Sequence, residues 1–333
     1  MDPSLLARAP EEGARLLALS FLDQAAAAFP RLKDPTDTEA LHDFRVALRR
    51  LRSCLRAYRP QLDDSLSKKR RRRLRDLAQA TGPGRDTEVQ IEWLRPQSQH
   101  LAASHRASLA WLLARLDERM RKAQHALIDQ LDDEFPGLEQ SLRRKLTVYR
   151  TEIHLDPQAR RPTFGEATAA ILREQSQELE THLARIEDAD DETEAHEARI
   201  SAKRLRYLLE PLLDDLPAAA PLVKRLKALQ DVLGELHDAH VLETGLHDAA
   251  ATASSDRAFK LFQLSVEPAP DEKVLRAERS RSVESGLIAL GRLNRARRDR
   301  LFQKVEEDWL QGRAAEFFGE LGAVTGLGGQ ETP

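Results

Sequence analysis

The 333-residue sequence predicts an all-α protein, and three observations support this prediction. Ala, Leu, Glu and Arg are abundant, whereas aromatic residues make up 5% of the chain and Val and Ile are sparse, which favours helix over strand. Gly and Pro gather at a few places, so long helices with short connections are expected. Apolar residues recur at the period of a helix along most of the chain.

Helix stop and start signals divide the first part of the chain. The first expected helix ends before Pro30, because proline cannot continue a helix. The next follows a polar cluster in which Asp37 or Thr38 can cap it, and Gly82-Pro83-Gly84 ends the third. The expected helices here span 11–29, 38–58, 63–81, 85–94, 97–133 and 138–150.

A second series of helices follows a segment at 155–165 that contains two prolines and a glycine and is the best candidate for a linker. These helices are expected to span 166–187, 193–213, 222–233, 238–251, 255–266 and 272–321. An interruption of the last one is expected near Gly286 and Gly291, and a disordered tail from Gly322 onward.

An internal repeat relates the two parts of the chain. HDFRVALRRLR at 42–52 recurs as HEARISAKRLR at 196–206, an offset of 154. Downstream, LRDL at 74–77 recurs as LKAL at 226–229, an offset of 152. Two separated motifs at nearly one offset indicate a duplication. We therefore predict a first helical bundle over 1–150, a linker over 151–165, a second bundle over 166–321 related to the first by a pseudo-two-fold axis, and a disordered tail over 322–333.

The net charge of −3 conceals strong segregation of charge. Between residues 41 and 75 the chain has 13 Lys and Arg against three acids, whereas 187–197 contains seven acids and no Lys or Arg. Charge that is segregated in this way indicates the kind of partner better than the total does. The basic region predicts an anionic partner.

Each copy of the repeat places a row of cations on one helix face, beside an apolar stripe. The rows consist of His42, Arg45, Arg49, Arg52 and Arg56 in the first copy and of His196, Arg199, Lys203 and Arg206 in the second. Glu210 stands where the fifth cation of the second row would be, which suggests that this end matters less. Neighbouring cations in a row are roughly 5–6 Å apart and repel one another. A polyanion along the rows would neutralise them, because guanidinium groups grip phosphate oxygens in a fork. The alternative is that these arginines are solvated and pair with acids on neighbouring helices.

A second basic helix contains six consecutive cations at 68–73, followed by Arg75. Arg72 and Arg75 share a face and align with Lys224 and Lys227 of the other repeat, so we place these four residues on the ligand side. Lys69 and Arg70 are expected to face solvent. A contribution from a late basic helix is left open; its arginines include Arg292, Arg295 and Arg298.

The histidines and acids indicate neither a metal site nor a catalytic one. His42 and His196 begin the two rows, where each can contact phosphate or bond to a nearby carboxylate. His237 and His240 share a face, but the sequence lacks a third ligand and an HExxH motif. Asp86 and Asp238 are expected to cap helices or pair with arginines. We expect no metal, no cofactor and no enzymatic activity.

The chain is expected to work in the cytoplasm. The single Cys54 excludes an internal disulfide framework and fits a reducing compartment. The first ten residues lack a basic start followed by an apolar run, so no secretory leader is expected. The most apolar early stretch is interrupted by polar residues and too short to span a bilayer, so no membrane partner is expected.

These motifs resemble those of the CHAD family, the conserved-histidine α-helical domain. The resemblance rests on HDFRVALRRLR at 42–52, HEARISAKRLRYLLE at 196–210 and LKALQDVLGELHDAHV at 226–241, and it covers about 14–310. It implies two four-helix bundles related by pseudo-two-fold symmetry, with basic surfaces that meet at a central groove or channel. It also implies binding of inorganic polyphosphate and, in some bacteria, association with polyphosphate granules.

Carried onto this sequence, the resemblance implies a set of binding residues on both copies of the motif. They are His42, Arg45, Arg49, Arg50, Arg52, His196, Arg199, Lys203, Arg204 and Arg206, joined by Arg75 and Lys227. The first half departs from the pattern where Gly82-Pro83-Gly84-Arg85 replaces the Gly234-Glu235-Leu236-His237 of the second, which leaves the role of this loop in doubt. The β-barrel and ExExK signature of the triphosphate-tunnel enzymes that accompany some family members are not visible here.

Two other functions compete with polyphosphate binding. Nucleic-acid binding would need aromatic platforms for bases, yet only Tyr58 and Tyr207 adjoin the rows, and both are expected in the core. Nucleic acid is therefore an unlikely partner. A metal-dependent phosphohydrolase would need a ligand set or a nucleophile, which the sequence does not offer.

Overall fold

The computed structural model describes residues 4–34, 36–62, 66–148, 162–268, 271–280 and 283–326, and these form helices and no strand. The predicted all-α class is therefore confirmed. The α-helices are α1 (Pro10–Ala28), α2 (Ala40–Ala57), α3 (Arg59–Leu62), α4 (Lys68–Ala80), α5 (Gly82–Leu94), α6 (Arg106–Leu146), α7 (Phe164–Leu183), α8 (Glu192–Leu209), α9 (Ala220–Ser265), α10 (Glu272–Ser280), α11 (Glu284–Trp309) and α12 (Ala314–Val324). Short 3-10 helices connect them at Leu5–Ala7, Phe29–Lys33, Arg95–Gln99, Ala103–His105, Glu210–Leu212 and Pro217–Ala219.

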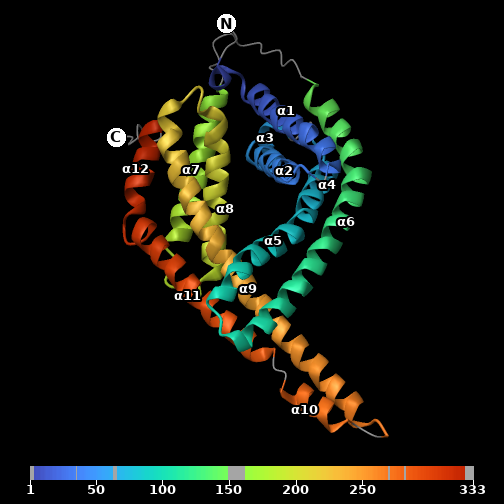
Figure 1. Ribbon diagram of the computed structural model, residues 1–333. Helices are drawn as coiled ribbons and strands as arrows, with labels where there is room; N and C mark the ends of the chain where they lie inside the picture. Colours follow the sequence, from blue (N-terminus) through green and yellow to red (C-terminus); the bar gives the residue numbers. More distant parts are fainter. Residues whose placement is uncertain are drawn as a thin grey trace, which may run out of the picture.

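The two helices that carry the repeated motif lie against each other at the centre of the molecule (Figure 1). Helix α2 packs on α1 and α4, whereas α8 packs on α7 and α9, and α2 also contacts α8. The far end of α9 projects from the body together with α10. This arrangement brings the two cationic rows to the same region, while the duplication itself stays a prediction from the sequence.

The hydrophobic core consists of two clusters, and both predicted halves contribute to each. The larger cluster joins α1, α2 and α4 to α7, α8 and α9; within it, the rings of Tyr58 and Phe164 lie 4.9 Å apart between centroids. The smaller cluster joins α5 and α6 to α9 and α11. Burial of apolar area in the larger cluster fixes α2 and α8 relative to each other.

Helix α2 forms because its apolar and basic residues segregate at helical spacing. Phe44, Leu48, Leu51 and Leu55 are buried in the larger cluster. The helix begins at Ala40, whose backbone N–H donates to Asp37 Oδ1 at 3.0 Å. The N-cap position is Glu39, one residue after the two predicted candidates, and Asp37 accepts from the N–H groups of Glu39 and Ala40.

Two long helices correct the predicted breaks in the chain. Helix α6 continues through Pro136, where a break between 133 and 138 was expected. The loss of one backbone hydrogen bond at Pro136 is offset by the burial of Phe135 and Leu138 on either side. Helix α9 runs through Gly234 and on to Ser265, so the three helices predicted there form one. Leu233 and Leu236 are buried across the first expected gap, and Ala253 is buried in the second.

The last helical region is interrupted at one of the two expected places. The interruption predicted near Gly286 is confirmed, since α10 ends at Ser280 and α11 begins at Glu284, whereas Gly291 lies inside α11 and the break predicted there is wrong. The chain also turns between α11 and α12, where Gln311 and Gly312 adopt positive φ angles of 56° and 89°. Gly286 has a packing role, since a Cβ atom there would lie 2.4 Å from the Cβ of Ser108 on α6.

The predicted linker and tail fall partly outside the described residues. Of the linker at 151–165, the last two residues belong to α7, which begins at Phe164 with Thr163 and Glu166 in a capping box. Of the tail predicted from Gly322, the first three residues still belong to α12. The rest of both segments, 151–161 and 327–333, lies outside the described residues.

Candidate anion-binding pocket

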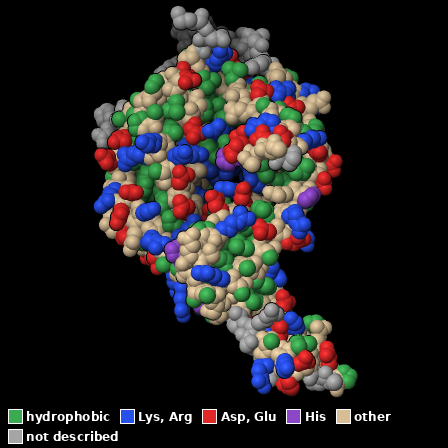
Figure 2. All heavy atoms as spheres, viewed as in Figure 1, with side chains coloured by type: hydrophobic (Ala, Val, Ile, Leu, Met, Phe, Trp, Pro, Cys, Tyr) green, Lys and Arg blue, Asp and Glu red, His purple; other side chains and the backbone are tan. Residues whose placement is uncertain are grey.

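A pocket of about 770 Å³ opens between α2, α4, α7 and α8, and Figure 2 shows a hollow with Lys and Arg side chains in the middle of the body. We call it the central basic pocket. Ten of its lining side chains are cationic: Arg49, Arg52, Arg56, Arg59, Lys68, Arg71, Arg72, Arg75, Lys203 and Arg204. Among the described residues, two lining side chains are acidic, Glu174 and Glu178, and both come from α7. The pocket is therefore strongly electropositive.

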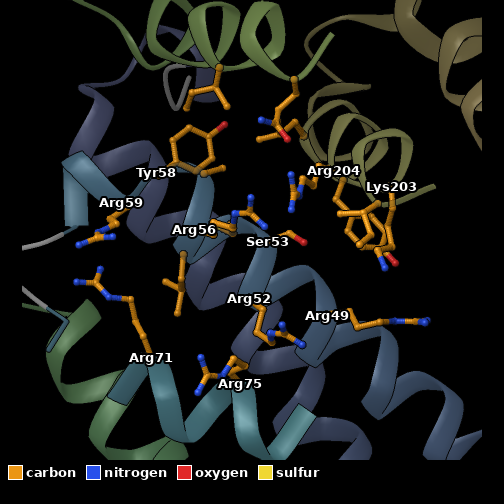
Figure 3. A pocket seen from close by; sticks show the side chains of 18 of the residues that line it. Arg49, Arg52, Ser53, Arg56, Tyr58, Arg59, Arg71, Arg75, Lys203 and Arg204 are labelled. Atoms are coloured by element: carbon orange, nitrogen blue, oxygen red, sulfur yellow. The ribbon is translucent and has the colours of Figure 1, made fainter. Parts of the chain in front are cut away.

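The cations reach the pocket because three helices turn their basic faces toward it (Figure 3). Arg49, Arg52 and Arg56 project from α2, on the face beside the leucines that α2 buries in the core. Lys203 and Arg204 approach from α8. The cations of α4 close the remaining side.

Several of these cations have no carboxylate partner in the part of the chain that the structure describes. Arg49, Arg52, Arg56 and Lys203 make no ion pair or hydrogen bond with another described residue. Arg204 is different, because its Nη1 lies 3.0 Å from Glu178 Oε2. The first four side chains are thus free to bind an anion that enters the pocket.

Burial and mutual repulsion disfavour the charged forms of the basic side chains in the pocket. Burial, followed by the charges of the nearby guanidinium groups of Arg199, Arg49, Arg52 and Arg204, lowers the pKa of Lys203 to about 7. Burial, followed by the charges of Arg75 and Arg56, likewise lowers the pKa of Arg52. Arginine stays protonated at any ordinary pH, so the repulsion persists until an anion relieves it.

Six of the fourteen predicted binding residues line the central basic pocket. They are Arg49, Arg52, Arg72, Arg75, Lys203 and Arg204. Arg72 and Arg75 make contacts of 3.6 Å and 3.2 Å to Asp76 on the exposed side of α4. Such exposed pairs are weak, on the order of 0–1 kcal/mol, and leave both arginines available.

Three further predicted residues lie beside the pocket, next to α5 and α9. Arg45 approaches Gly84 of α5, and Arg199 approaches Gly234 of α9, at 3.5 Å and 3.7 Å from the position of an ideal Cβ. The ring of His196 lies 4.8 Å from that of His237, and burial and the charge of Arg199 lower the pKa of both histidines. Arg45 and Arg199 extend the cationic surface without lining the pocket, and His196 lies beside Arg199.

The other five predicted residues do not meet in the pocket. Arg50 and Arg206 both turn to Glu210, at 2.7 Å and 3.2 Å, and Arg50 lines a smaller separate pocket with that carboxylate. These two arginines follow the alternative interpretation, in which a cation pairs with an acid on the protein. His42 is exposed at the start of α2, and Lys224 and Lys227 are exposed on α9.

The structure adds cations that sequence reasoning missed. Arg59, Lys68 and Arg71 line the pocket, and so does Arg56, at the end of the row that was given less weight. Their spacing of four or seven residues from Arg52 or Arg75, which keeps them on the same helix face, contained the signal. Arg70 was expected to face solvent, which is wrong: its Nε donates to Ser141 Oγ at 2.8 Å.

The late helix α11 does not supply the pocket. Arg298 is 7% exposed and lies 2.7 Å from Asp190 and 3.2 Å from Glu243, so it joins helices of the protein.

Asp238 lies within α9 and does not cap a helix. Burial raises the pKa of its carboxyl group, although the nearby charges of Arg199 and Arg297 oppose this change.

Within the described residues, no group of three or more His, Cys, Asp or Glu side chains is arranged to hold a metal ion. In the same residues, no helix combines the length and apolar character that crossing a membrane requires. Tyr58 and Tyr207 are buried, as expected, at 0% and 3% exposure.

Comparisons with known proteins agree with this architecture. The CHAD domain family model matches residues 17–247. The CHAD domain from the plant Ricinus communis is 22% identical with a TM-score of 0.59, over 85% of this chain and 96% of that one. PptA from Streptomyces chartreusis is 16% identical with a TM-score of 0.60, over 90% of this chain and 99% of that one. No curated protein sequence matches the chain. Because the family model spans more than half of the sequence, this chain belongs to the CHAD domain family.

Proposed function

We propose that this protein binds inorganic polyphosphate, without catalysis, in the central basic pocket. The observation that carries the proposal is the set of four crowded cations, Arg49, Arg52, Arg56 and Lys203, that have no carboxylate partner among the described residues. A folded protein holds like charges together at a cost in stability, and a dense anion removes that cost. Membership of the CHAD domain family supports the same ligand.

The shape and chemistry of the pocket favour an inorganic polymer over a nucleic acid. Binding of single strands relies on aromatic faces that stack with bases. Tyr58 and Tyr207 line the pocket, but both are buried, and Tyr58 bonds to Thr168 at 2.8 Å between hydroxyl oxygens. A ligand that offers phosphate oxygens at every unit and no base satisfies the guanidinium groups best.

The site is tested by reversing two charges of the pocket, one from α2 and one from α8. The variant Arg49→Glu/Lys203→Glu removes two contacts to phosphate, each worth about 1.5 kcal/mol or more when the partner is charged. We expect its affinity for long-chain polyphosphate to fall by roughly 100-fold or more in a gel-shift titration.

A matched control separates this site from a general effect of net charge. Lys69 and Arg73 are exposed on α4 and do not line the pocket, so Lys69→Glu/Arg73→Glu changes the net charge by the same amount. We expect this control to bind within a few-fold of the wild type. Equal losses in the two double variants would overturn the assignment of the pocket.

The choice of ligand and the absence of catalysis are tested with the wild-type protein. RNA at equal phosphate concentration should not displace polyphosphate. Displacement would show that the pocket does not distinguish the inorganic polymer from a nucleic acid. Incubation with polyphosphate and Mg²⁺ or Mn²⁺ should release no orthophosphate. Release that is lost in Arg49→Glu/Lys203→Glu would show that the protein is an enzyme.

A further inference from the structure

Lys203 occupies an unusual position among the lysines of the described chain. Its side chain lines the central basic pocket together with Arg49, Arg52 and Arg204 (Figure 3). Arg199 lies four residues earlier on α8, about one helical turn away. No carboxylate of the described residues pairs with it. The amine is therefore open to the pocket and surrounded by groups that bind phosphate.

The surroundings of Lys203 favour its nucleophilic form. An amine attacks an electrophile only when it is unprotonated, and an ordinary lysine is almost entirely protonated at pH 7. Here burial and the four guanidinium groups hold the pKa at about 7, so about half of the amine is free at neutral pH. The same guanidinium groups offer docking sites for the phosphate of an incoming reagent.

We propose that Lys203 is a modification site at which small acyl phosphates acylate the side-chain amine. The guanidinium groups hold the phosphate, which places the adjacent carbonyl carbon beside the amine. The nitrogen lone pair attacks that carbon and forms a C–N bond, while the carbon–oxygen bond to phosphate breaks. Inorganic phosphate leaves, the nitrogen loses a proton to solvent, and a neutral amide replaces the amine.

This modification would control the proposed function by removing a charge from the centre of the pocket. That consequence rests on polyphosphate binding, whereas the acylation itself does not. We expect the acylated protein to bind polyphosphate at least several-fold more weakly. We also expect bound polyphosphate to protect Lys203 from the reagent, because both occupy the same guanidinium groups.

The experiment uses the full chain and acetyl phosphate at pH 7, with acetylation followed at each lysine by mass spectrometry. Lys68 is the internal control, because it lines the same pocket but is exposed on α4. The unprotonated fraction of Lys203 exceeds that of an ordinary lysine by roughly 1000-fold. Its lower basicity offsets part of this gain, so we expect acetylation at Lys203 at least about 10-fold faster than at Lys68. Equal rates at the two lysines would overturn the proposal.

A second reagent and a variant separate docking from the reactivity of the amine. p-Nitrophenyl acetate carries no phosphate, so its preference for Lys203 over Lys68 should be smaller than that of acetyl phosphate. An equal preference would show that the guanidinium groups do not dock the reagent. Arg49→Gln should slow acetylation by acetyl phosphate at Lys203 and leave Lys68 unchanged. Polyphosphate binding by the unmodified protein is measured in a separate titration. The titration tests the proposed function and the acetylation rates test the modification site, so a failure of one proposal can be distinguished from a failure of the other.

Discussion

At the scale of single residues, the proposed binding depends on basic side chains that are crowded and have no carboxylate partner among the described residues. Lys203 is the clearest case, because four guanidinium groups surround its amine and no described carboxylate pairs with it. Arg50 and Arg206 show the opposite outcome, since both turn to Glu210. Arg49 and Arg50 are neighbours in the same motif, yet Arg49 lines the pocket and Arg50 pairs with a carboxylate, because, among the described residues, an acid lies within reach of Arg50 but not of Arg49.

The lowered pKa of Lys203 predicts how the stability of the free protein changes with pH. The folded-state pKa is about 7 and the unfolded value is near 10.5, so the unfolded chain binds more protons between these limits. The free energy of unfolding should therefore rise as the pH increases from 7 to 9. Lys203→Met should flatten this rise in urea titrations. An equally steep rise in the variant would contradict the assignment.

Binding of polyphosphate should show the opposite dependence on pH. A bound anion favours the charged amine, so at pH 9 the protein must take up a proton to bind, whereas at pH 6 it is already charged. We expect the affinity to fall between pH 7 and pH 9 at constant salt, by up to about tenfold for each pH unit. Lys203→Arg stays charged, and its affinity should not change over this range.

The cations of α2 and α8 could be predicted from the sequence, because helical geometry fixes the relative positions of residues within each helix. Arg49 and Arg52 share a face by spacing alone, and Lys203 has the same place in the second copy. Glu174 and Glu178 of α7 could not be predicted, since no local pattern shows which helix packs beside them. The partner of Arg50 is likewise set by tertiary contact across 160 residues.

At the scale of elements, burial decides where helices continue and where they end. Helix α9 passes Gly234 and α6 passes Pro136, because apolar side chains on both sides of each residue pack into the core. Local propensity predicted breaks at these places, but its contribution is of order 1 kcal/mol for glycine and about 3 kcal/mol for proline. Several buried leucines outweigh these amounts.

Two glycines of α11 give a matched test of this view. A Cβ at Gly286 would lie 2.4 Å from Ser108 Cβ and 3.0 Å from the carbonyl oxygen of His105, so Gly286→Ala should destabilise the protein by about 1–3 kcal/mol. Nothing lies within 4 Å of a Cβ at Gly291, so Gly291→Ala should stabilise it by about 0.5–1 kcal/mol. Urea unfolding measures both, and the same sign for the two variants would contradict the packing described here.

At the scale of the whole molecule, the two predicted halves share both hydrophobic clusters. The pocket lies where they meet, with α2 and α4 from the first half and α7 and α8 from the second. The all-α class and the meeting of the motif helices followed from the sequence. The sharing of the core did not, because helical periodicity shows that a face is buried and not which helix covers it.

The salt dependence of binding is a property of this whole charged surface. A polyanion that is held by several cations releases counterions when it binds, so the logarithm of the affinity should fall linearly with the logarithm of the salt concentration. We expect Arg49→Glu/Lys203→Glu to show a shallower slope than the wild type in titrations at several salt concentrations. An unchanged slope would mean that other cations hold the polymer.

A crystal structure of the protein with a short linear polyphosphate bound would show directly whether the central basic pocket holds this ligand. We expect phosphate groups between α2, α4 and α8, within hydrogen-bonding distance of Arg49, Arg52 and Lys203. Phosphate bound only on the outer face of α4, beside Lys69 and Arg73, with the central basic pocket empty, would contradict this expectation.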